Sequence, residues 1–240
     1  MSGHSKWSTI KRAKEANDAK RGNLFTKLGN NITVAAKDGG GDPETNFSLR
    51  LAIDRAKSAN MPKDNIERAI KRGTGELKGD QIEEISYGGL LPGNRPIIIK
   101  CLTDNKNRTV TEVKTILQKN GGQLTDLNSV SWQFENKGVL IVSSKKINKK
   151  QEEIEMSVIE SGADDYEIND DETIIYTRPE DLQEVKKGLE QNNFKIESAE
   201  LKMVAKEKKE LNDIDAGKVE KILSLLSELD DVSDYYTNIQ

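Results

Sequence analysis

Lys and Arg side chains are dense at the start of this 240-residue chain. Within the first 27 residues only Glu15 and Asp18 oppose a set of seven cations, which are Lys6, Lys11, Arg12, Lys14, Lys20, Arg21 and Lys27. Clustered cations bind a phosphate backbone by releasing its condensed counterions, a contact that depends on salt and carries little sequence information. The basic arm therefore predicts contact with a nucleic acid, although the same charges could also serve only as a solvated helical face.

The net charge changes sign along the chain. Residues 1–75 hold 15 Lys and Arg against 8 Asp and Glu, a balance of +7. The remaining 165 residues hold 22 against 33, a balance of −11. An acidic body repels a polyanion, so we expect DNA or RNA to contact the basic end alone.

Two further features could add to this surface. Trp7 stands beside Lys6 and could stack on an unpaired base, or it could pack onto its own domain. A second basic cluster is predicted near the end of a short helix, where its charges could equally complement the helix dipole. Its members are Lys63, Arg68, Lys71 and Arg72, of which Lys63, Lys71 and Arg72 are predicted contact residues.

Catalytic and metal chemistry find little support in the residue types. His4 is the single His and Cys101 the single Cys, so neither a zinc site nor a Cys–His pair can be assembled. Acidic runs at 164–165 and 170–172 could hold a hard cation, but acidic surface turns are far commoner. We expect no enzyme activity, no cofactor, no metal and no small-molecule substrate.

Two polar loops allow a phosphate-binding interpretation. Gly39–Gly41 lacks the glycine spacing and the Lys-Ser/Thr ending of a nucleotide-binding loop, so helix capping is favoured. The run 104–108 follows a predicted strand and precedes a helix. There, side-chain capping by Asp104 or Asn105 competes with contact to RNA.

Residues 1–76 are predicted to form a basic helical domain. Apolar side chains from Leu24 to Ala35 follow a helical period that ends at the glycine run, and Asp42–Pro43 is expected to cap and begin the next helix. A third helix is expected from Pro62 to Gly73.

The apolar period then changes to that of strands. Strands are expected at 82–87 and 97–103, joined by a turn over 88–93, and after one helix a further strand at 130–134. Residues 137–206 show a complete βαββαβ pattern, the split βαβ arrangement.

A helix near 219–229 and a strand near 232–236 could supply what the earlier ββαβ pattern lacks, or could form a separate pair. We predict an α+β chain made of an N-terminal helical bundle and two ferredoxin-like (split βαβ) domains. Residues 77–136 and 207–240 would form the discontinuous middle domain, with 137–206 inserted into it.

Several long strings in this sequence resemble the YebC/PmpR family. They are 3–7 (GHSKW), 18–22 (DAKRG), 33–44 (TVAAKDGGGDPE), 60–76 (NMPKDNIERAIKRGTGE), 101–109 (CLTDNKNRT), 129–134 (SVSWQF) and 235–238 (YYTN). The resemblance spans the whole chain and implies a helical N-terminal domain and two α+β domains, the last inserted within the second. The chain departs from the usual family pattern at Leu90–Pro96 and Thr125–Asn128, so no contact is carried over to those two loops.

The resemblance implies a non-enzymatic protein. Bacterial members are described as probable transcriptional regulators that bind DNA, and other members as translation factors on the ribosome, including a mitochondrial translational activator. The first description predicts a transcriptional regulatory protein that binds DNA through its basic N-terminal domain. The alternative is a ribosome-associated translation factor that binds ribosomal RNA with the same surface. The lack of a clear helix-turn-helix and the frequent use of split βαβ sheets on RNA favour the alternative.

The compartment follows from what the sequence lacks. No run of about 18 apolar residues is present, so we expect no membrane partner. The lone cysteine suits a reducing compartment, and the first residues lack the apolar stretch of a secretory signal. We expect a cytoplasmic protein.

Overall fold

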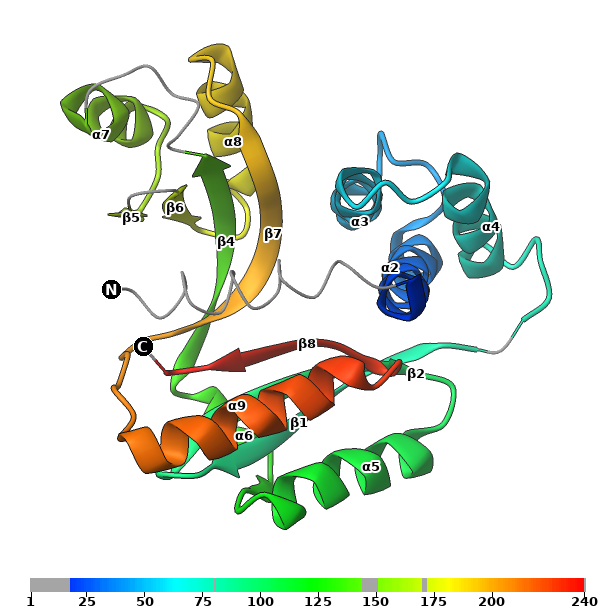
Figure 1. Ribbon diagram of the computed structural model, residues 1–240. Coiled ribbons are helices and arrows are strands. Elements are labelled where there is room, and N and C mark those ends of the chain that lie inside the picture. The colour runs from blue at the N-terminus through cyan, green and yellow to red at the C-terminus, as the bar shows by residue number, and fades with distance from the viewer. Residues whose placement is uncertain (1–17, 80, 144–150, 170–171, 240) are drawn as a thin grey trace. The chain divides into compact units, whose positions relative to one another are not determined.

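The computed structural model describes residues 18–79, 81–143, 151–169 and 172–239 (Figure 1). For 18–21 and 151–152 it describes the backbone alone. The described residues divide into two compact units, one made of 135–204 and one made of 18–134 with 205–239. None of the helices in these ranges has the length and apolar character that a membrane crossing requires.

Three helices begin the larger unit: α2 (Asp18–Gly39), α3 (Phe47–Ser58) and α4 (Lys63–Gly73). Their apolar stripes meet in one core, as the helical period predicts. Its buried members include Leu28, Ile32, Leu49, Ile53 and Ile66.

The glycine run ends α2 as expected, but the start of α3 differs from the prediction. Gly40 adopts a left-handed φ of 87° just after the helix. Asp42 does not cap α3; Asn46 does, accepting a hydrogen bond from the Leu49 amide at 3.0 Å. The Asn46 amide also donates to two backbone carbonyls, each at 2.7 Å. An ionised Asp can only accept, so this buried position, which must serve donors and acceptors, suits Asn.

The larger unit also contains a four-stranded sheet of order β3-β1-β2-β8, in which each neighbouring pair is antiparallel. Its strands are β1 (Glu83–Leu91), β2 (Arg95–Thr103), β3 (Gln123–Thr125) and β8 (Val232–Thr237). Because β1 lies between β2 and β3, the segment from β2 through α5 (Lys106–Lys119) to β3 is a split βαβ.

Helices α5 and α9 (Asp213–Glu228) lie on the same side of this sheet (Figure 1). They share a buried core with the strands, which includes Ile97, Ile99, Leu117, Ile222 and Leu226. The opposite side of β2 contributes Leu102 to a small buried cluster with Val34 of α2 and Ile82. The sheet is therefore packed against both the α5–α9 layer and the helical bundle.

Two predictions for this unit are wrong, the turn over 88–93 and the strand at 130–134. Residues 88–91 belong to β1, and the turn is confined to 92–94. A Cβ on Gly88 would lie 2.8 Å from the Asp126 carbonyl oxygen, so the glycines allow close approach here and do not mark a turn. Residues 128–131 form the short helix α6 (Asn128–Ser131), and β3 takes the place of the predicted strand at 130–134.

The second unit has the predicted split βαβ sheet. Its elements are β4 (Phe134–Ser143), α7 (Gln151–Glu160), β5 (Asp165–Ile168), β6 (Glu172–Thr177), α8 (Leu182–Gln191) and β7 (Ile196–Ala205). The strand order is β5-β6-β4-β7, with β6 antiparallel to both β4 and β5. Leu140, Val158, Ile175 and Leu189 are fully buried between sheet and helices. The chain is therefore α+β with two antiparallel four-stranded sheets.

Candidate nucleic-acid interface

The structure describes part of the predicted basic surface. Lys6, Trp7, Lys11, Arg12 and Lys14 lie outside the described residues. The backbone of Lys20 and Arg21 lies in the first turn of α2. The side chains of Lys27, Lys63, Lys71 and Arg72 are described and divide into two locations, one on α2 and one on α4.

Helix α4 turns an apolar face inward and a cationic end outward. Ile66 and Ala69 are buried in the helical core, whereas Arg68, Lys71 and Arg72 are exposed. Residues four apart lie on one helix face, so Arg68 and Arg72 lie one turn apart with Lys71 beside them. Lys71 and Arg72 also complement the dipole in the last turn, as the alternative interpretation held.

The chain after α4 brings a fourth cation to this end. Gly75 has a left-handed φ of 82°, and the Leu77 amide donates back to the Lys71 carbonyl at 3.0 Å. A Cβ on Gly79 would lie 3.3 Å from the Arg72 side chain, so the segment that carries exposed Lys78 lies against α4. Arg68, Lys71, Arg72 and Lys78 form what we call the α4 cationic end. None of the four is ion-paired with another residue in the described ranges.

The two remaining predicted cations are engaged within the fold. Lys63 pairs with Glu67 at 3.5 Å on the solvent face of α4. Lys27 donates to the carbonyl oxygen of Ser227 at 2.7 Å, near the end of α9. The last carbonyls of a helix lack intrahelical partners and carry partial negative charge, which a Lys side chain complements. Lys27 thus attaches α2 to α9, whatever else it contacts.

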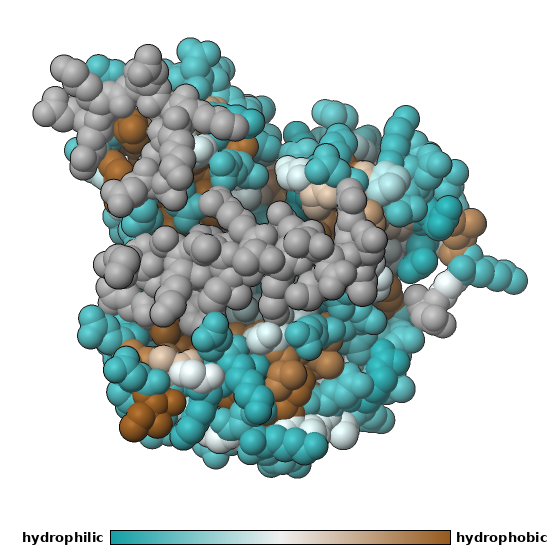
Figure 2. Space-filling view, in the orientation of Figure 1, coloured by the Kyte–Doolittle hydropathy of each residue, from teal (hydrophilic) through white to brown (hydrophobic). Residues whose placement is uncertain are grey.

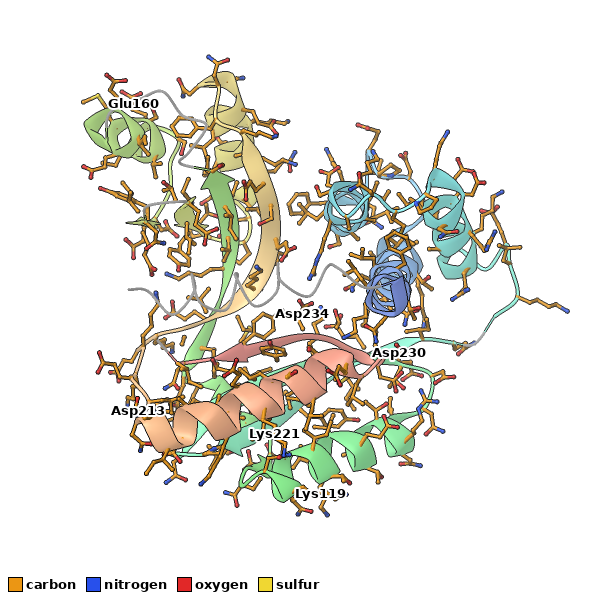
Figure 3. The ribbon with its side chains drawn as sticks, viewed as in Figure 1. Lys119, Glu160, Asp213, Lys221, Asp230 and Asp234 are labelled. Carbon is orange, nitrogen blue, oxygen red and sulfur yellow. The ribbon has the colours of Figure 1, made fainter. Side chains whose placement is uncertain are left out.

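Further side chains of the helical bundle attach to the turn between α9 and β8. Asn23 donates to the Glu228 carbonyl at 2.9 Å and to the Asp230 carboxylate at 2.7 Å. Arg55 of α3 pairs with Asp234 at 3.1 Å. Figure 3 labels Asp230 in this turn and Asp234 on β8. The helical bundle is therefore joined by polar contacts to the end of α9, to the turn after it and to β8. The apolar contact of Val34 with Leu102 of β2 adds to these.

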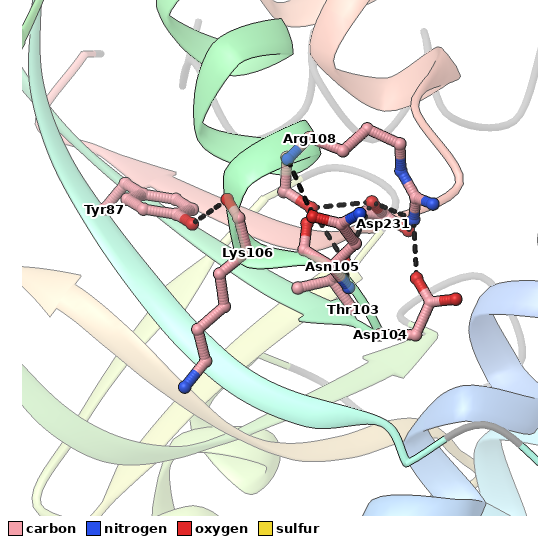
Figure 4. Close-up of polar contacts among 8 residues, drawn as sticks. Tyr87, Thr103, Asp104, Asn105, Lys106, Arg108 and Asp231 are labelled. Carbon is pink, nitrogen blue, oxygen red and sulfur yellow. Dashed lines mark hydrogen bonds and ion pairs between the residues drawn. The ribbon is translucent and has the colours of Figure 1, made fainter.

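The polar run 104–108 is tied to the same turn by Asp231 (Figure 4). Asn105 caps α5 by accepting from the Arg108 amide at 3.1 Å, which confirms capping for this loop. The Asp231 carboxylate accepts from Arg108 at 2.8 Å, from Thr109 at 2.7 Å and from Thr103 at 3.1 Å. Burial works against the charge of Asp231, but these hydrogen bonds, Arg108 first, outweigh it and lower its pKa.

The cations of this run have acidic partners on neighbouring strands or turns. Lys106 forms an ion pair with Glu83 of β1, and its hydrogen bond lowers the pKa of the Glu83 carboxyl. Arg108 bonds both Asp231 and Asp104, and these bonds raise its pKa. Both cations of the run 104–108, Lys106 and Arg108, are therefore ion-paired with carboxylates of the same unit.

The two segments that depart from the usual family pattern, Leu90–Pro96 and Thr125–Asn128, each begin with a residue of the sheet. Leu90 of β1 pairs with Gln123 of β3, and Thr125 of β3 pairs with Gly88 of β1, so the two segments do not pair with each other.

Metal-binding side chains do not gather in the described part of the chain. No group of three His, Cys, Asp or Glu side chains there could hold a metal ion. Cys101 is buried in β2, and burial raises the pKa of its thiol to about 12. On the face that Figure 2 draws, most of the coloured residues are hydrophilic, and hydrophobic residues form separate groups.

Comparison with known proteins covers nearly the whole chain. Residues 5–76 match the TACO1/YebC protein N-terminal domain, and residues 82–239 match the TACO1/YebC second and third domain. The chain belongs to the TACO1/YebC family. This TACO1/YebC chain is 47% identical to a "probable transcriptional regulatory protein" of Bacillus licheniformis, with 100% of each chain covered. A protein of the same name from Pseudothermotoga lettingae is 48% identical over 100% of this chain and 94% of its own.

A solved structure has a similar fold. The crystal structure of the conserved hypothetical protein Aq1575 from Aquifex aeolicus matches with a TM-score of 0.86 at 44% identity. The match covers 93% of this chain and 91% of that one.

Proposed function

We propose that this TACO1/YebC chain is a non-enzymatic regulator that binds DNA through its basic helical domain. The observation that carries the proposal is the α4 cationic end, where four exposed cations lie without an ion pair to another described residue. Three of its members, Arg68, Lys71 and Arg72, belong to residues 1–75, which have a balance of +7. The names of the relatives support transcription as the regulated process.

Two cations that pair with carboxylates of strand β1 in the same unit contrast with the α4 cationic end. Lys100 pairs with Glu84 at 2.8 Å, and Lys106 pairs with Glu83. A cation that is paired with a carboxylate offers little net attraction to phosphate. An unpaired exposed cation that binds a phosphate releases a counterion condensed on the nucleic acid. We therefore infer that the α4 cationic end, and not Lys100 or Lys106, contacts the polyanion.

The charge order along α4 indicates contact with phosphates more than with base edges. Helices α3 and α4 are joined by residues 59–62, a connection as short as that of a helix-turn-helix. In that motif the N-terminal residues of the second helix reach the bases. Here that end carries exposed Asp64, Glu67 and the Lys63 that pairs with Glu67, and the cations without an ion pair among the described residues follow in the second half. We expect strong salt dependence and weak sequence preference.

The same feature favours a second candidate, a ribosome-associated translation factor or translational activator that binds ribosomal RNA. A surface that contacts phosphates without reading bases serves folded RNA as well as duplex DNA. The sheet of the second unit adds no support: Tyr176 on its central strand β6 is buried and its hydroxyl donates to Glu167 at 3.1 Å, so its ring is not free to stack.

The proposed contact residues extend beyond α4. They are the predicted Lys6, Trp7, Lys11, Arg12, Lys14, Lys20, Arg21, Lys27, Lys63, Lys71 and Arg72, to which the α4 cationic end adds Arg68 and Lys78. We also propose a cytoplasmic location and domains at 1–76, at 77–136 with 207–240, and at 137–206. The compact unit 135–204 and the family match ending at residue 76 support this division.

The test removes the α4 charges and compares an equal loss elsewhere. We expect the full-length variant R68Q/K71Q/R72Q/K78Q to bind duplex DNA at least about tenfold more weakly at about 150 mM salt. The matched control K114Q/K119Q/K218Q/K221Q removes four exposed Lys from α5 and α9, of which Figure 3 labels Lys119 and Lys221. Equal affinities for the two variants would contradict the proposal. If the wild-type protein co-sediments with ribosomes but does not bind duplex DNA, the translation factor is the favoured candidate.

A further inference from the structure

Trp132 is the most exposed aromatic side chain in the described part of the chain. Its exposed fraction is 67%, while its neighbours in sequence, Val130 and Phe134, are 1% and 4% exposed. The helical turn of α6 directs the ring outward, whereas in the predicted strand all three side chains would have faced one side.

The Trp132 ring is held in place by its own turn. The indole Nε1–H donates to the Ser129 carbonyl at 3.0 Å, and Ser129 Oγ donates to the Asp126 carbonyl at 2.6 Å. Asp126 also accepts from the Asn128 amide at 2.8 Å, and Val130 anchors the turn in the core. A fixed ring loses little conformational freedom when a ligand stacks on it. Because its N–H is already bonded, the ring offers a ligand its π face and not a hydrogen bond.

The surroundings of this ring are polar. Asp126, Asn128 and Ser129 in the same turn are exposed and polar. The Lys206 amide donates to the Gln133 carbonyl at 2.9 Å, so the polar segment 206–209, in which Lys209 pairs with Glu207 at 3.9 Å, starts beside the residue next to Trp132. The core of a protein–protein interface is apolar, and none of the other large exposed hydrophobic side chains among the described residues lies in the turn 125–133. A nucleobase, with a flat π face and polar edges, fits these surroundings better.

We propose that Trp132 is a stacking site for an unpaired base of a single-stranded nucleic acid. The inference rests on the proposed nucleic-acid function but uses a different surface from the α4 cationic end. It implies that the partner presents both a phosphate backbone and an accessible base, as a loop, a bulge or an opened strand does.

The chain permits a direct optical test, because Trp7 and Trp132 are its two tryptophans. In full-length W7F, indole fluorescence comes from Trp132 alone. We expect quenching by a uridine-rich single-stranded oligoribonucleotide, and none by an oligomer of equal length built from abasic nucleotides or by a blunt duplex. W132A should weaken single-strand binding by roughly 5- to 100-fold and leave duplex binding unchanged, while W132F should retain most of the affinity.

The outcomes separate this inference from the proposed function. Single-strand binding without quenching, and with equal affinity in W132A, overturns the stacking site alone. The stacking site is also overturned if W132A binds the oligomer with normal affinity but no longer binds whole ribosomes. Trp132 would then contact a protein and not a base. If the wild-type chain binds no nucleic acid at any salt concentration, both proposals fail. Unchanged thermal unfolding of W132A and W132F checks that the exposed ring is not needed for folding.

Discussion

Substitution of Asp231 should destabilise the larger unit far more than substitution of Asp104, although both carboxylates bond Arg108. Asp231 also accepts from the hydroxyls of Thr103 and Thr109, whose side chains are buried. Hydrogen bonds to a charged group contribute roughly 1.5–3 kcal/mol, and a buried hydroxyl left without an acceptor adds to the loss. Both threonines keep other partners, so we expect about 2–4 kcal/mol for Asp231→Ala. For a unit of this size that is a Tm decrease of about 5–15 °C.

The matched control is Asp104→Ala, because its ion pair with Arg108 is exposed and spaced i, i+4. Such pairs contribute about 0.5 kcal/mol or less. Urea unfolding of both variants beside the wild type measures the difference. Equal destabilisation by the two substitutions would refute the reasoning, since burial and the two hydroxyls would then make no contribution.

The pH dependence of the same variant gives an independent check. The pKa of Asp231 is lowered in the fold, so its stabilisation is complete above the unfolded-state pKa of about 3.9 and is lost as the pH falls through the lower folded value. The deficit of Asp231→Ala should therefore hold from about pH 7 to about pH 5 and shrink below about pH 4. A deficit that grows on acidification would contradict this assignment.

Three further predictions follow from packing. Gly73→Ala should lower the free energy of unfolding by about 2 kcal/mol or more, because a Cβ there would clash with the Thr33 carbonyl oxygen. Gly22→Ala, which has open space on α2, should raise it by about 0.5–1 kcal/mol. Thermal unfolding of the two variants compares them. Asn46→Ala should cost about 2–3 kcal/mol in urea unfolding, since the cap of α3 is lost and the carbonyls of Ala35 and Gly40 lose a donor. Cys101 should react with a thiol reagent at about pH 8 no faster than the unit unfolds, since its raised pKa and burial leave little accessible thiolate; labelling faster than unfolding would contradict that burial.

Local periodicity predicted the helices and most strands because those signals lie within one element. The stripe from Leu24 to Ala35 and the βαββαβ pattern of 137–206 each needed only neighbouring residues, and the structure has α2 and the split βαβ sheet there. The errors fall where a tertiary contact overrides the local signal. Glycines at 88–89 resemble a turn but lie in β1, and Val130 with Phe134 alternates like a strand although α6 intervenes.

The candidate site was predictable in composition but not in detail. Charge counting located the basic domain, yet Lys78 joins the α4 cationic end only because the left-handed Gly75 turns the chain back. Likewise the bond between Asn23 and the Glu228 carbonyl joins residues 205 apart in sequence, and nothing in either local pattern indicates it. Cations that can bind phosphate differ from cations that stabilise the fold in whether they have a carboxylate or carbonyl partner. Those partners are brought together only in the folded chain.

The most direct measurement is the salt dependence of nucleic-acid affinity for the wild type, R68Q/K71Q/R72Q/K78Q and K114Q/K119Q/K218Q/K221Q. Each lost phosphate contact lowers the slope of log affinity against log salt by about 0.9 on duplex DNA. We predict a slope shallower by about 3–4 for the α4 variant and an unchanged slope for the control. Identical slopes for all three proteins, or a wild-type slope near zero, would contradict the claim that the helical domain binds a polyphosphate.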